Sequence, residues 1–501
     1  RSKMSARAHM ASGFVPQLRG QSASGRAWCA YYDAADRDRV HPRLARIAAM
    51  EVMTMLRLLK RRAAGWVLWP LAWAVVAQSQ EATTFSPEQL REDLASIESA
   101  LARTHPDLSH SVDPAVLGRA IDDARSKLNR PMTAGEAWKV MSGLNPVMAD
   151  GHLTVLYPGG TAAEVQRHLK IGGRLFPYAV YVTRGAIFVH SRLDGSATPL
   201  AGKRIDSIEG VPADEVVRKL LAHMNGDTPA QRDELLSDRF AFWYWKFFGE
   251  HRSFRLRIDG VESVTEASAD TPSAYREKTF EQQFRFELLA GNAALLTIDE
   301  FYWSDKPKFY EFTRAAFERM REAGTRTLII DIRANSGGDD DVWYEGIMPY
   351  IATRPYRNGS AYLLKIIEGR AKEGQKVGDV VRGTQDTVYQ PQLDNPLRFK
   401  GKVYVLISPR TYSSAVLFST AVQDHGFATL VGVGGGARST QSGGVQFIRL
   451  PHTQMTIVVP RFVLTRASGR DGLLQPDILV VGDPFRPRSA IESILRLDRG
   501  P

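Results

Sequence analysis

The chain has 501 residues, of which 44% are apolar and 24% are charged. This length predicts two to four domains, and the composition excludes a disordered chain, a collagen and a protein with many membrane spans. The formal net charge is +10, but residues 1–62 carry 13 basic and 4 acidic residues, which leaves +1 for the remainder. A body so close to neutral predicts no nucleic-acid partner.

The N-terminal residues are typical of an export signal. Residues 1–54 are rich in Arg, Ala and Ser, and we interpret them as an upstream or mis-assigned leader. Residues 55–77 join a basic start to the uncharged run Ala63–Ala77, which is shorter than the about 20 residues of a membrane-spanning helix. We therefore expect a cleaved signal peptide, with a signal anchor as the alternative. A cleaved signal predicts a periplasmic or secreted protein with no stable membrane span after cleavage.

Residues 78–165 are expected to form an N-terminal helical region. Ser86 and Pro87 form a typical helix start, and Thr133 with Glu136 resembles a capping box for a second helix. Apolar residues follow the first start at helical spacing: Leu90, Leu94, Ile97 and Leu101. The turn Asp150-Gly151-His152 then leads into a strand. A lone histidine in such a turn is most often solvated or hydrogen-bonded.

Residues 170–265 are expected to form a small β-rich module. Short strands at Tyr178–Val182 and Ala186–His190 precede a glycine-bounded stretch and a helix at Ala213–Leu221. The aromatic run Phe240–Phe248 is interpreted as buried packing, and contact with a peptide or a membrane is the alternative.

Residues 280–490 show the alternation of strands and helices that is typical of an α/β core with mostly parallel strands. Thr327–Ile332 is continuously apolar apart from Asp331, as expected for a strand that is buried on both faces. Further strands are expected at Ala294–Ile298, Val403–Ile407, Ala428–Val433 and Met455–Val459, with helices at Lys308–Glu322, 340–352 and Ser413–Asp424.

Two glycine-rich segments of this core allow more than one interpretation. The Gly337-Gly338 turn can expose backbone N–H groups to an anion, as half of an oxyanion hole, or it can be an ordinary strand–helix turn. The acidic run Asp339–Asp341 fits a helix start better than a metal site. The segment Gly432–Ser439 lacks the following helix that nucleotide binding requires, so we expect a mobile flap.

The segment around Ser413 lies between a buried strand and a helix. A serine at a helix N-terminus meets free N–H groups, which suits an attacking hydroxyl whose product is an oxyanion. The same position is also a common place for a serine that caps a helix. The residues alone favour capping.

Several segments together occur in a known order: Asp331-x-Arg333-x-Asn335-x-Gly337-Gly338, Ser413 with Phe418 and Asp424, and Gln475-Pro476-Asp477. They resemble the tail-specific, C-terminal processing peptidase family. The resemblance implies a crotonase-like (ClpP-type) α/β core, preceded by the N-terminal helical region and a PDZ-like module. It also implies a peptide or unfolded-protein substrate, and a reaction that needs neither a cofactor nor a metal.

The resemblance implies specific roles. Ser413 would be the nucleophile, and the N–H groups of Ser414 and Gly337 would hold the oxyanion. Many members carry a lysine base twenty-five residues after the serine, but this chain has Arg438 there, which is a poor base. No lysine occurs between Val403 and Pro501.

The general base is therefore expected to be a histidine. His425 and His452 are weaker candidates, and the His152 turn is similar to the histidine segment of the Ser–His branch that includes the tricorn protease. Asp471 is the candidate orienting acid.

The sequence thus predicts a secreted or periplasmic serine peptidase that forms an acyl-enzyme on Ser413. The alternative is a non-catalytic peptide- or lipid-binding relative with the same fold, and an esterase is a third possibility. The sequence does not indicate the oligomeric state.

Overall fold

The computed structural model describes residues 83–499, without the side chain of Arg499. The expected leader (1–54) and signal peptide (55–77) lie outside the described residues. Within 83–499, no helix is both long and apolar enough to cross a membrane.

The N-terminal region is helical, as predicted. Its elements are β1 (Thr84–Phe85), α3 (Pro87–Thr104), η1 (Leu108–His110), α4 (Pro114–Lys127), β2 (Met132–Thr133), α5 (Ala134–Met141), α6 (Leu144–Met148), β3 (Thr154–Val155) and α7 (Thr161–Lys170). Ser86 and Gln89 form a capping box at the start of α3, and Thr133 and Glu136 form one at the start of α5. The expected apolar stripe of α3 is buried.

The β-rich module comprises β4 (Tyr178–Thr183), β5 (Ala186–Arg192), β6 (Arg204–Ile208), β7 (Val211–Pro212), α8 (Ala213–Leu221), α9 (Pro229–Phe248), β8 (Ser253–Ile258) and β9 (Val261–Glu266). Its strand order is β4-β5-β6-β8-β9. Phe240–Tyr244 of α9 are buried, which confirms that the aromatic run is a packing feature. Ser237 of α9 accepts a hydrogen bond from the N–H of Val182 in the edge strand β4 at 2.8 Å, and Asp233 of α9 accepts one from the N–H of Arg184, just after β4, at 2.9 Å.

The C-terminal core has a six-stranded sheet in the order β10-β11-β12-β15-β16-β21, parallel except for the β10–β11 pair. Its strands are β10 (Phe284–Leu289), β11 (Ala293–Ile298), β12 (Thr327–Asp331), β15 (Lys402–Ile407), β16 (Thr429–Gly432) and β21 (Ile478–Leu479). Its helices are α10 (Phe280–Gln283), α11 (Lys306–Glu322), α12 (Asp340–Gly346), α13 (Met348–Ile351), α14 (Ser414–Asp424) and α15 (Ser489–Arg499), and a short helix η2 (Ser273–Tyr275) precedes them.

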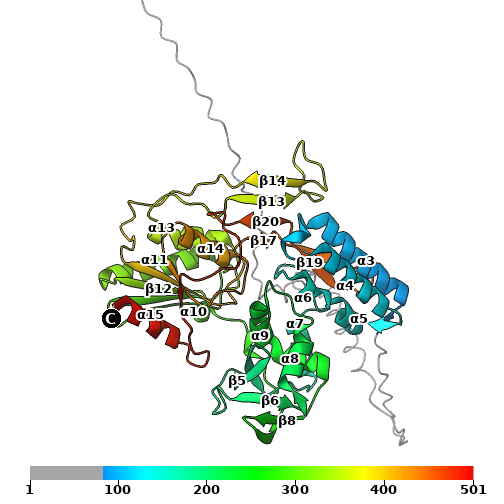
Figure 1. Ribbon diagram of the computed structural model, residues 1–501. Coiled ribbons are helices and arrows are strands. Elements are labelled where there is room, and N and C mark those ends of the chain that lie inside the picture. Colours follow the sequence, from blue (N-terminus) through cyan, green and yellow to red (C-terminus); the bar gives the residue numbers. More distant parts are fainter. Residues whose placement is uncertain (1–82, 500–501) are drawn as a thin grey trace, which may run out of the picture.

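Strand β12 is buried on both faces, as its apolar sequence predicted. Leu328 and Ile330 pack with residues of α11, α12 and α14, whereas Ile329 packs with residues of α15. Helices therefore cover both sides of the sheet (Figure 1). This arrangement confirms the predicted α/β fold class.

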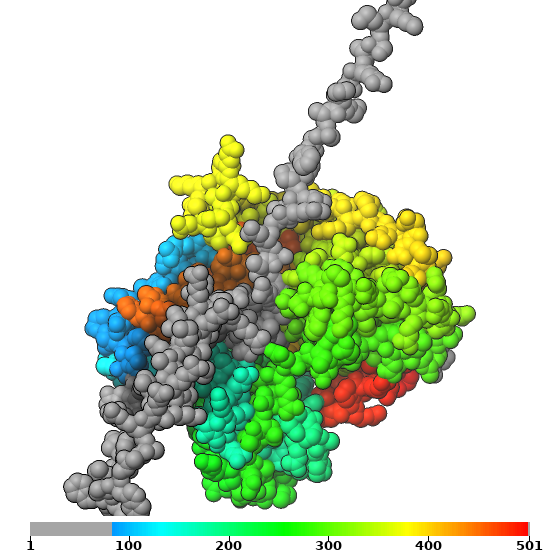
Figure 2. All heavy atoms as spheres, turned by 180° about the vertical axis from the view of Figure 1, so that it is seen from behind, coloured from blue at the N-terminus to red at the C-terminus, as the bar shows by residue number. Residues whose placement is uncertain are grey.

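The C-terminal part also forms two small sheets, one of which includes a strand of the N-terminal region. One has the order β14-β13-β20-β17, from β13 (Ala361–Lys365), β14 (Val380–Thr384), β17 (Gln441–Gly443) and β20 (Phe462–Thr465). The other joins β18 (Gln446–Arg449) and β19 (Thr456–Val459) to β3 of the N-terminal region. The hairpin of β13 and β14, which the sequence did not predict, stands out from the surface (Figures 1 and 2).

The β18–β19 pair returns the chain to its N-terminal part. Leu450, Met455 and Ile457 belong to the same apolar cluster as helix α3.

The predicted flap at Gly432–Ser439 is wrong, because this segment is packed: a Cβ on Gly436 would stand 2.0 Å from the carbonyl oxygen of Pro409, and Ala437 and Ser439 are buried.

Candidate active site

Ser413 and His152 lie within hydrogen-bond distance although 261 residues separate them in the sequence. The Nε2 atom of His152 is 3.0 Å from the Oγ atom of Ser413. Ser413 has φ 54° and ψ −127°, in the turn between β15 and α14. A positive φ is unusual for a residue other than glycine, and such strain is common at active sites. The Ser413 side chain makes no capping hydrogen bond to α14, so the capping interpretation is wrong.

The His152 turn is shaped by its neighbours. Asp150 Oδ1 accepts a hydrogen bond from the backbone N–H of His152 at 2.7 Å. Gly151 must be a glycine, because a Cβ there would stand 2.6 Å from the ring of Tyr412. The rings of His152 and Tyr412 lie 4.8 Å apart. The turn is therefore pressed against the residue that precedes Ser413.

The orienting acid differs from the sequence prediction. The Nδ1 atom of His152 lies 3.0 Å from the hydroxyl of Ser442, and that hydroxyl donates to Asp150 Oδ1 at 2.9 Å. Asp471 is exposed and accepts a 3.4 Å hydrogen bond from Thr440. The assignment of Asp471 is therefore wrong, and Asp150 takes its place through Ser442.

This chain of hydrogen bonds sets the imidazole tautomer. Because the Ser442 hydroxyl donates to Asp150, its oxygen accepts from the Nδ1–H of His152. The Nε2 atom then carries the lone pair and faces Ser413. His152 is thereby arranged to accept the proton of the Ser413 hydroxyl.

Both predicted oxyanion residues lie beside Ser413, and the N–H of Ser414 remains the candidate donor. The N atom of Ser414 lies at the start of α14. A Cβ on Gly337 would stand 2.6 Å from the Cβ of Ser413 and 3.1 Å from the N atom of Ser414, so the Gly337 backbone lies against Ser413. The N–H of Gly337, however, donates to Asn335 Oδ1 at 2.9 Å. Gly337 therefore closes one side of the site, and its N–H is engaged by Asn335 rather than available as an oxyanion donor.

The acidic run after Gly338 has structural roles. Asp339 and Asp341 form ion pairs with Lys306 at 2.7 and 2.8 Å. Asp340 accepts a hydrogen bond from the hydroxyl of Ser414. Among the described residues, no group of His, Cys, Asp and Glu side chains is arranged to hold a metal ion. The helix-start interpretation of this run therefore fits better than a metal site.

Arg438 occupies the position of the family lysine, and its guanidinium binds neighbouring groups instead of Ser413. Its guanidinium donates to the carbonyl oxygen of Ala149 at 2.6 Å and lies 3.6 Å from Asp227 Oδ1.

Sequence reasoning missed three contributors to the site. Asp227 and Ser442 are two of them, and the third is Gln441, whose side chain accepts the N–H of Ser413 at 3.1 Å.

Burial controls the charge of His152. Desolvation lowers the pKa of His152 to about 4, although the charge of Asp150 acts in the opposite direction. The imidazole is therefore neutral at neutral pH, which is the form that can take a proton from Ser413.

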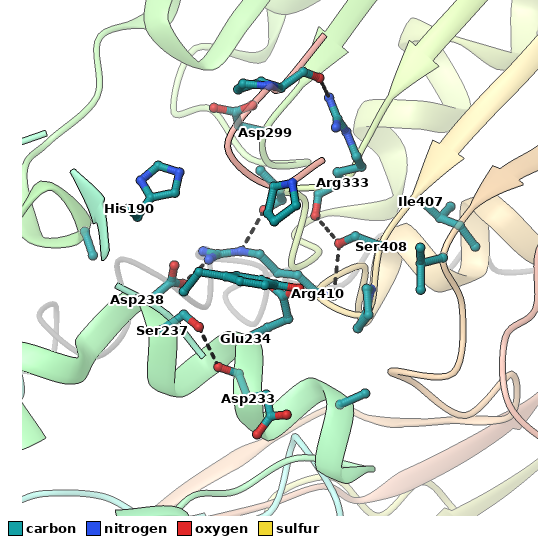
Figure 3. Close-up of a pocket in the computed structure, with 18 of the residues that line it drawn as sticks. His190, Asp233, Glu234, Ser237, Asp238, Asp299, Arg333, Ile407, Ser408 and Arg410 are labelled. Atoms are coloured by element: carbon teal, nitrogen blue, oxygen red, sulfur yellow. Dashed lines mark hydrogen bonds and ion pairs between the residues drawn. The ribbon is translucent and has the colours of Figure 1, made fainter. Parts of the chain in front are cut away.

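A large cleft is lined by Ser408, Pro409 and Arg410, which precede Ser413, but by neither Ser413 nor His152. Its volume is about 1920 Å³, and it is lined by β4, by α9 and by residues at the carboxyl ends of β12 and β15. Arg410, three residues before Ser413, reaches into the cleft between Ser408 and the α9 carboxylates of Asp238 and Glu234 (Figure 3). The cleft thus begins next to the serine segment.

Comparisons with known proteins agree with this geometry. Residues 292–480 match the family model described as "Peptidase family S41". The structure of mature CPAF superposes with a TM-score of 0.58 at 14% identity, over 82% of this chain and 97% of that chain. CPAF complexed with lactacystin gives the same TM-score, identity and share of this chain, over 98% of that chain. The photosystem II D1 C-terminal processing protease has a TM-score of 0.41 at 14% identity, over 81% of this chain and 96% of that chain.

No curated protein matches the chain. The fold and the family match define a serine-type peptidase, whose substrates are peptides or proteins. The part of the chain that matches peptidase family S41 is residues 292–480, which lie in the C-terminal core.

Replacing Asp150 should show whether Asp150 or Asp471 is the acid that orients His152. Asp150→Asn removes the charge that Ser442 and the His152 N–H contact, and it should lower kcat by about 10²- to 10⁴-fold because the imidazolium loses its support. Asp471→Asn is the matched control and should cleave a test peptide at the wild-type rate. Steady-state kinetics of both variants check this, and the opposite pattern would restore Asp471 as the acid.

Proposed function

We propose that this protein is an exported peptidase, periplasmic or secreted, that cleaves peptide bonds through an acyl-enzyme on Ser413 with His152 as the general base. This places the chain in the Ser–His branch of the family rather than the Ser–Lys branch. The single observation that carries the proposal is the 3.0 Å distance between Ser413 Oγ and His152 Nε2.

The first half of the reaction forms the acyl-enzyme. His152 Nε2 takes the proton of Ser413 as Oγ attacks the peptide carbonyl. The oxyanion that forms is stabilised by the N–H of Ser414 at the positive end of α14. The imidazolium, supported by Ser442 and Asp150, then gives its proton to the leaving amine.

The second half releases the product. His152 Nε2 takes a proton from a water molecule, which attacks the ester carbon of the acyl-enzyme. The proton then returns to Ser413 Oγ as the ester bond breaks and the new carboxylate leaves. The neutral state of His152 in the resting enzyme supports both deprotonations.

The cleft between α9 and the core is the proposed entry of the peptide. The N–H groups of Val182 in β4 and of Arg184 just after it are already bonded to α9. A substrate therefore cannot add to β4 as a strand at these two positions without displacing side chains of α9. We propose that the extended peptide instead follows the cleft toward Ser413.

A fluorophosphonate probe tests this function, since it reacts with an activated serine. The wild-type protein should be labelled at Ser413, as located by peptide mass spectrometry. Ser419→Ala, which changes a serine of the same helix whose hydroxyl donates to Ala415, should be labelled equally. A wild-type protein that is never labelled would favour a binding protein on this fold.

Export has its own test. The protein produced from a start at Met55 and recovered outside the cytoplasm should begin near residue 78 on N-terminal sequencing. Recovery of the intact chain in the cytoplasm would contradict export.

A further inference from the structure

We propose that Asp227 is a positioning residue that holds the His152 turn and the Ser413 segment in their reactive arrangement. The inference rests on the function proposed above. Asp227 lies in the loop between α8 and α9, outside the segments that resemble the family, and its side chain is 3% exposed.

The carboxylate of Asp227 contacts the immediate neighbours of both reacting residues. Its Oδ1 atom accepts a hydrogen bond from the N–H of Gly151 at 2.9 Å and from the hydroxyl of Tyr412 at 2.8 Å. Gly151 precedes His152, and Tyr412 precedes Ser413. One oxygen atom therefore links the backbone of the residue before the base to the side chain of the residue before the nucleophile.

A third segment is attached to the other oxygen. Asp227 Oδ2 accepts from the N–H of Arg438 at 2.8 Å, and the Arg438 guanidinium lies 3.6 Å from Oδ1. The same guanidinium donates to the carbonyl oxygen of Ala149, on the far side of the His152 turn. Arg438 therefore offsets the cost of burying the Asp227 charge and braces the turn.

The rest of the loop supports the same arrangement. Asn225 donates to the carbonyl oxygen of Gly151 at 2.8 Å, so both backbone groups of Gly151 are bound by this loop. Thr228 donates to the carbonyl oxygen of Gly436 at 2.9 Å. Because a Cβ on Gly151 would collide with Tyr412, the His152 turn and the Ser413 segment are in close contact at this point. Small shifts at Asp227 are therefore transmitted to the distance between His152 and Ser413.

Asp227→Asn tests the inference. The amide keeps the size of the side chain but loses the charge and one acceptor, so one of its three donors loses its partner. Both kcat and the rate of fluorophosphonate labelling should fall by about 100-fold, because displacements of about 1 Å between reacting groups cost this much. KM should stay within about twofold, since Asp227 is a positioning residue rather than a substrate contact.

Two further variants make the test specific. Asp259→Asn is the matched control: this carboxylate accepts the N–H of Arg204 at 3.0 Å in the β-rich module and does not line the cleft, so its loss should leave both rates unchanged. Tyr412→Phe removes the hydroxyl that donates to Asp227 at 2.8 Å and that also lies 3.4 Å from Asp150 Oδ1. It should lower the labelling rate, and combining it with Asp227→Asn should lower the rate by less than the product of the two effects.

The histidine NMR signals give a readout that does not depend on turnover. The His152 ring resonances, assigned with His152→Gln, should shift in Asp227→Asn and stay in place in Asp259→Asn. Wild-type rates and unmoved His152 resonances in Asp227→Asn would overturn the inference and leave the Ser413 proposal intact. An unlabelled wild-type protein would instead overturn the proposed function, and the His152 resonances would still decide the role of Asp227. If Asp227→Asn does not fold, Tyr412→Phe decides by the same measurements.

Discussion

Ser413→Ala should abolish peptide cleavage and fluorophosphonate labelling, with kcat lowered by about 10⁶-fold. The Ser413 hydroxyl faces His152 and makes no cap to α14, so its removal takes away the nucleophile and little else. The backbone of Ser413 stays bound through the side chain of Gln441. The thermal midpoint should therefore remain close to that of the wild-type protein.

The measurement compares cleavage, labelling and thermal unfolding of Ser413→Ala with those of Ser419→Ala. Cleavage retained by Ser413→Ala would move the nucleophile elsewhere. Ser414 is a poor substitute, because its hydroxyl donates to Asp340 and accepts from the indole N–H of Trp343 at 3.0 Å.

His152→Ala should lower kcat by about 10⁴- to 10⁶-fold with KM largely kept. The Ser413 hydroxyl then has no base, while the cleft that receives the peptide is unchanged. The labelling rate should fall together with kcat, because the probe also needs an activated serine. A His152→Ala enzyme that cleaves peptides at the wild-type rate would show that another group is the base.

The pH dependence of the wild-type enzyme provides a second check on His152. Burial lowers its pKa to about 4, so the folded protein keeps the imidazole neutral between pH 6.5 and about pH 4, where a free imidazole would be protonated. Only the neutral form acts as a base, so kcat/KM should fall with decreasing pH through a limb near pH 4. Burial also raises the pKa of Asp227 to about 6, so a limb near pH 6.5, the ordinary value for histidine, would contradict a buried base if it persists in Asp227→Asn.

Local patterns predicted the elements that depend on neighbouring residues. The capping boxes at Ser86 and Thr133 and the apolar strand Thr327–Asp331 carry their signals within a few residues, and the structure confirms them. The β13–β14 hairpin was missed because its half-exposed strands lack a strong alternation of apolar and polar residues.

The active site was predictable only in part, because its contacts span long distances in the sequence. The motif order pointed to Ser413 and His152, and the structure places them together. Ser442 reaches His152 across 290 residues, and Asp227 reaches Tyr412 across 185, with no local pattern to mark either contact. Asp150 did have a signal: it lies two residues before the histidine, where its carboxylate can bind the backbone of the same turn.

The pairing of β3 with β19 has a consequence for the order in which the protein becomes active. During synthesis, His152 is made early and Ser413 late, and the strand that holds the His152 segment, Thr456–Val459, is made later still. Ser442, which sets the imidazole tautomer, also follows the nucleophile. A growing chain therefore lacks an aligned base until its last part has folded back onto its first. Such distant contacts form slowly, so the emerging protein is protected from its own proteolytic activity until the fold is complete.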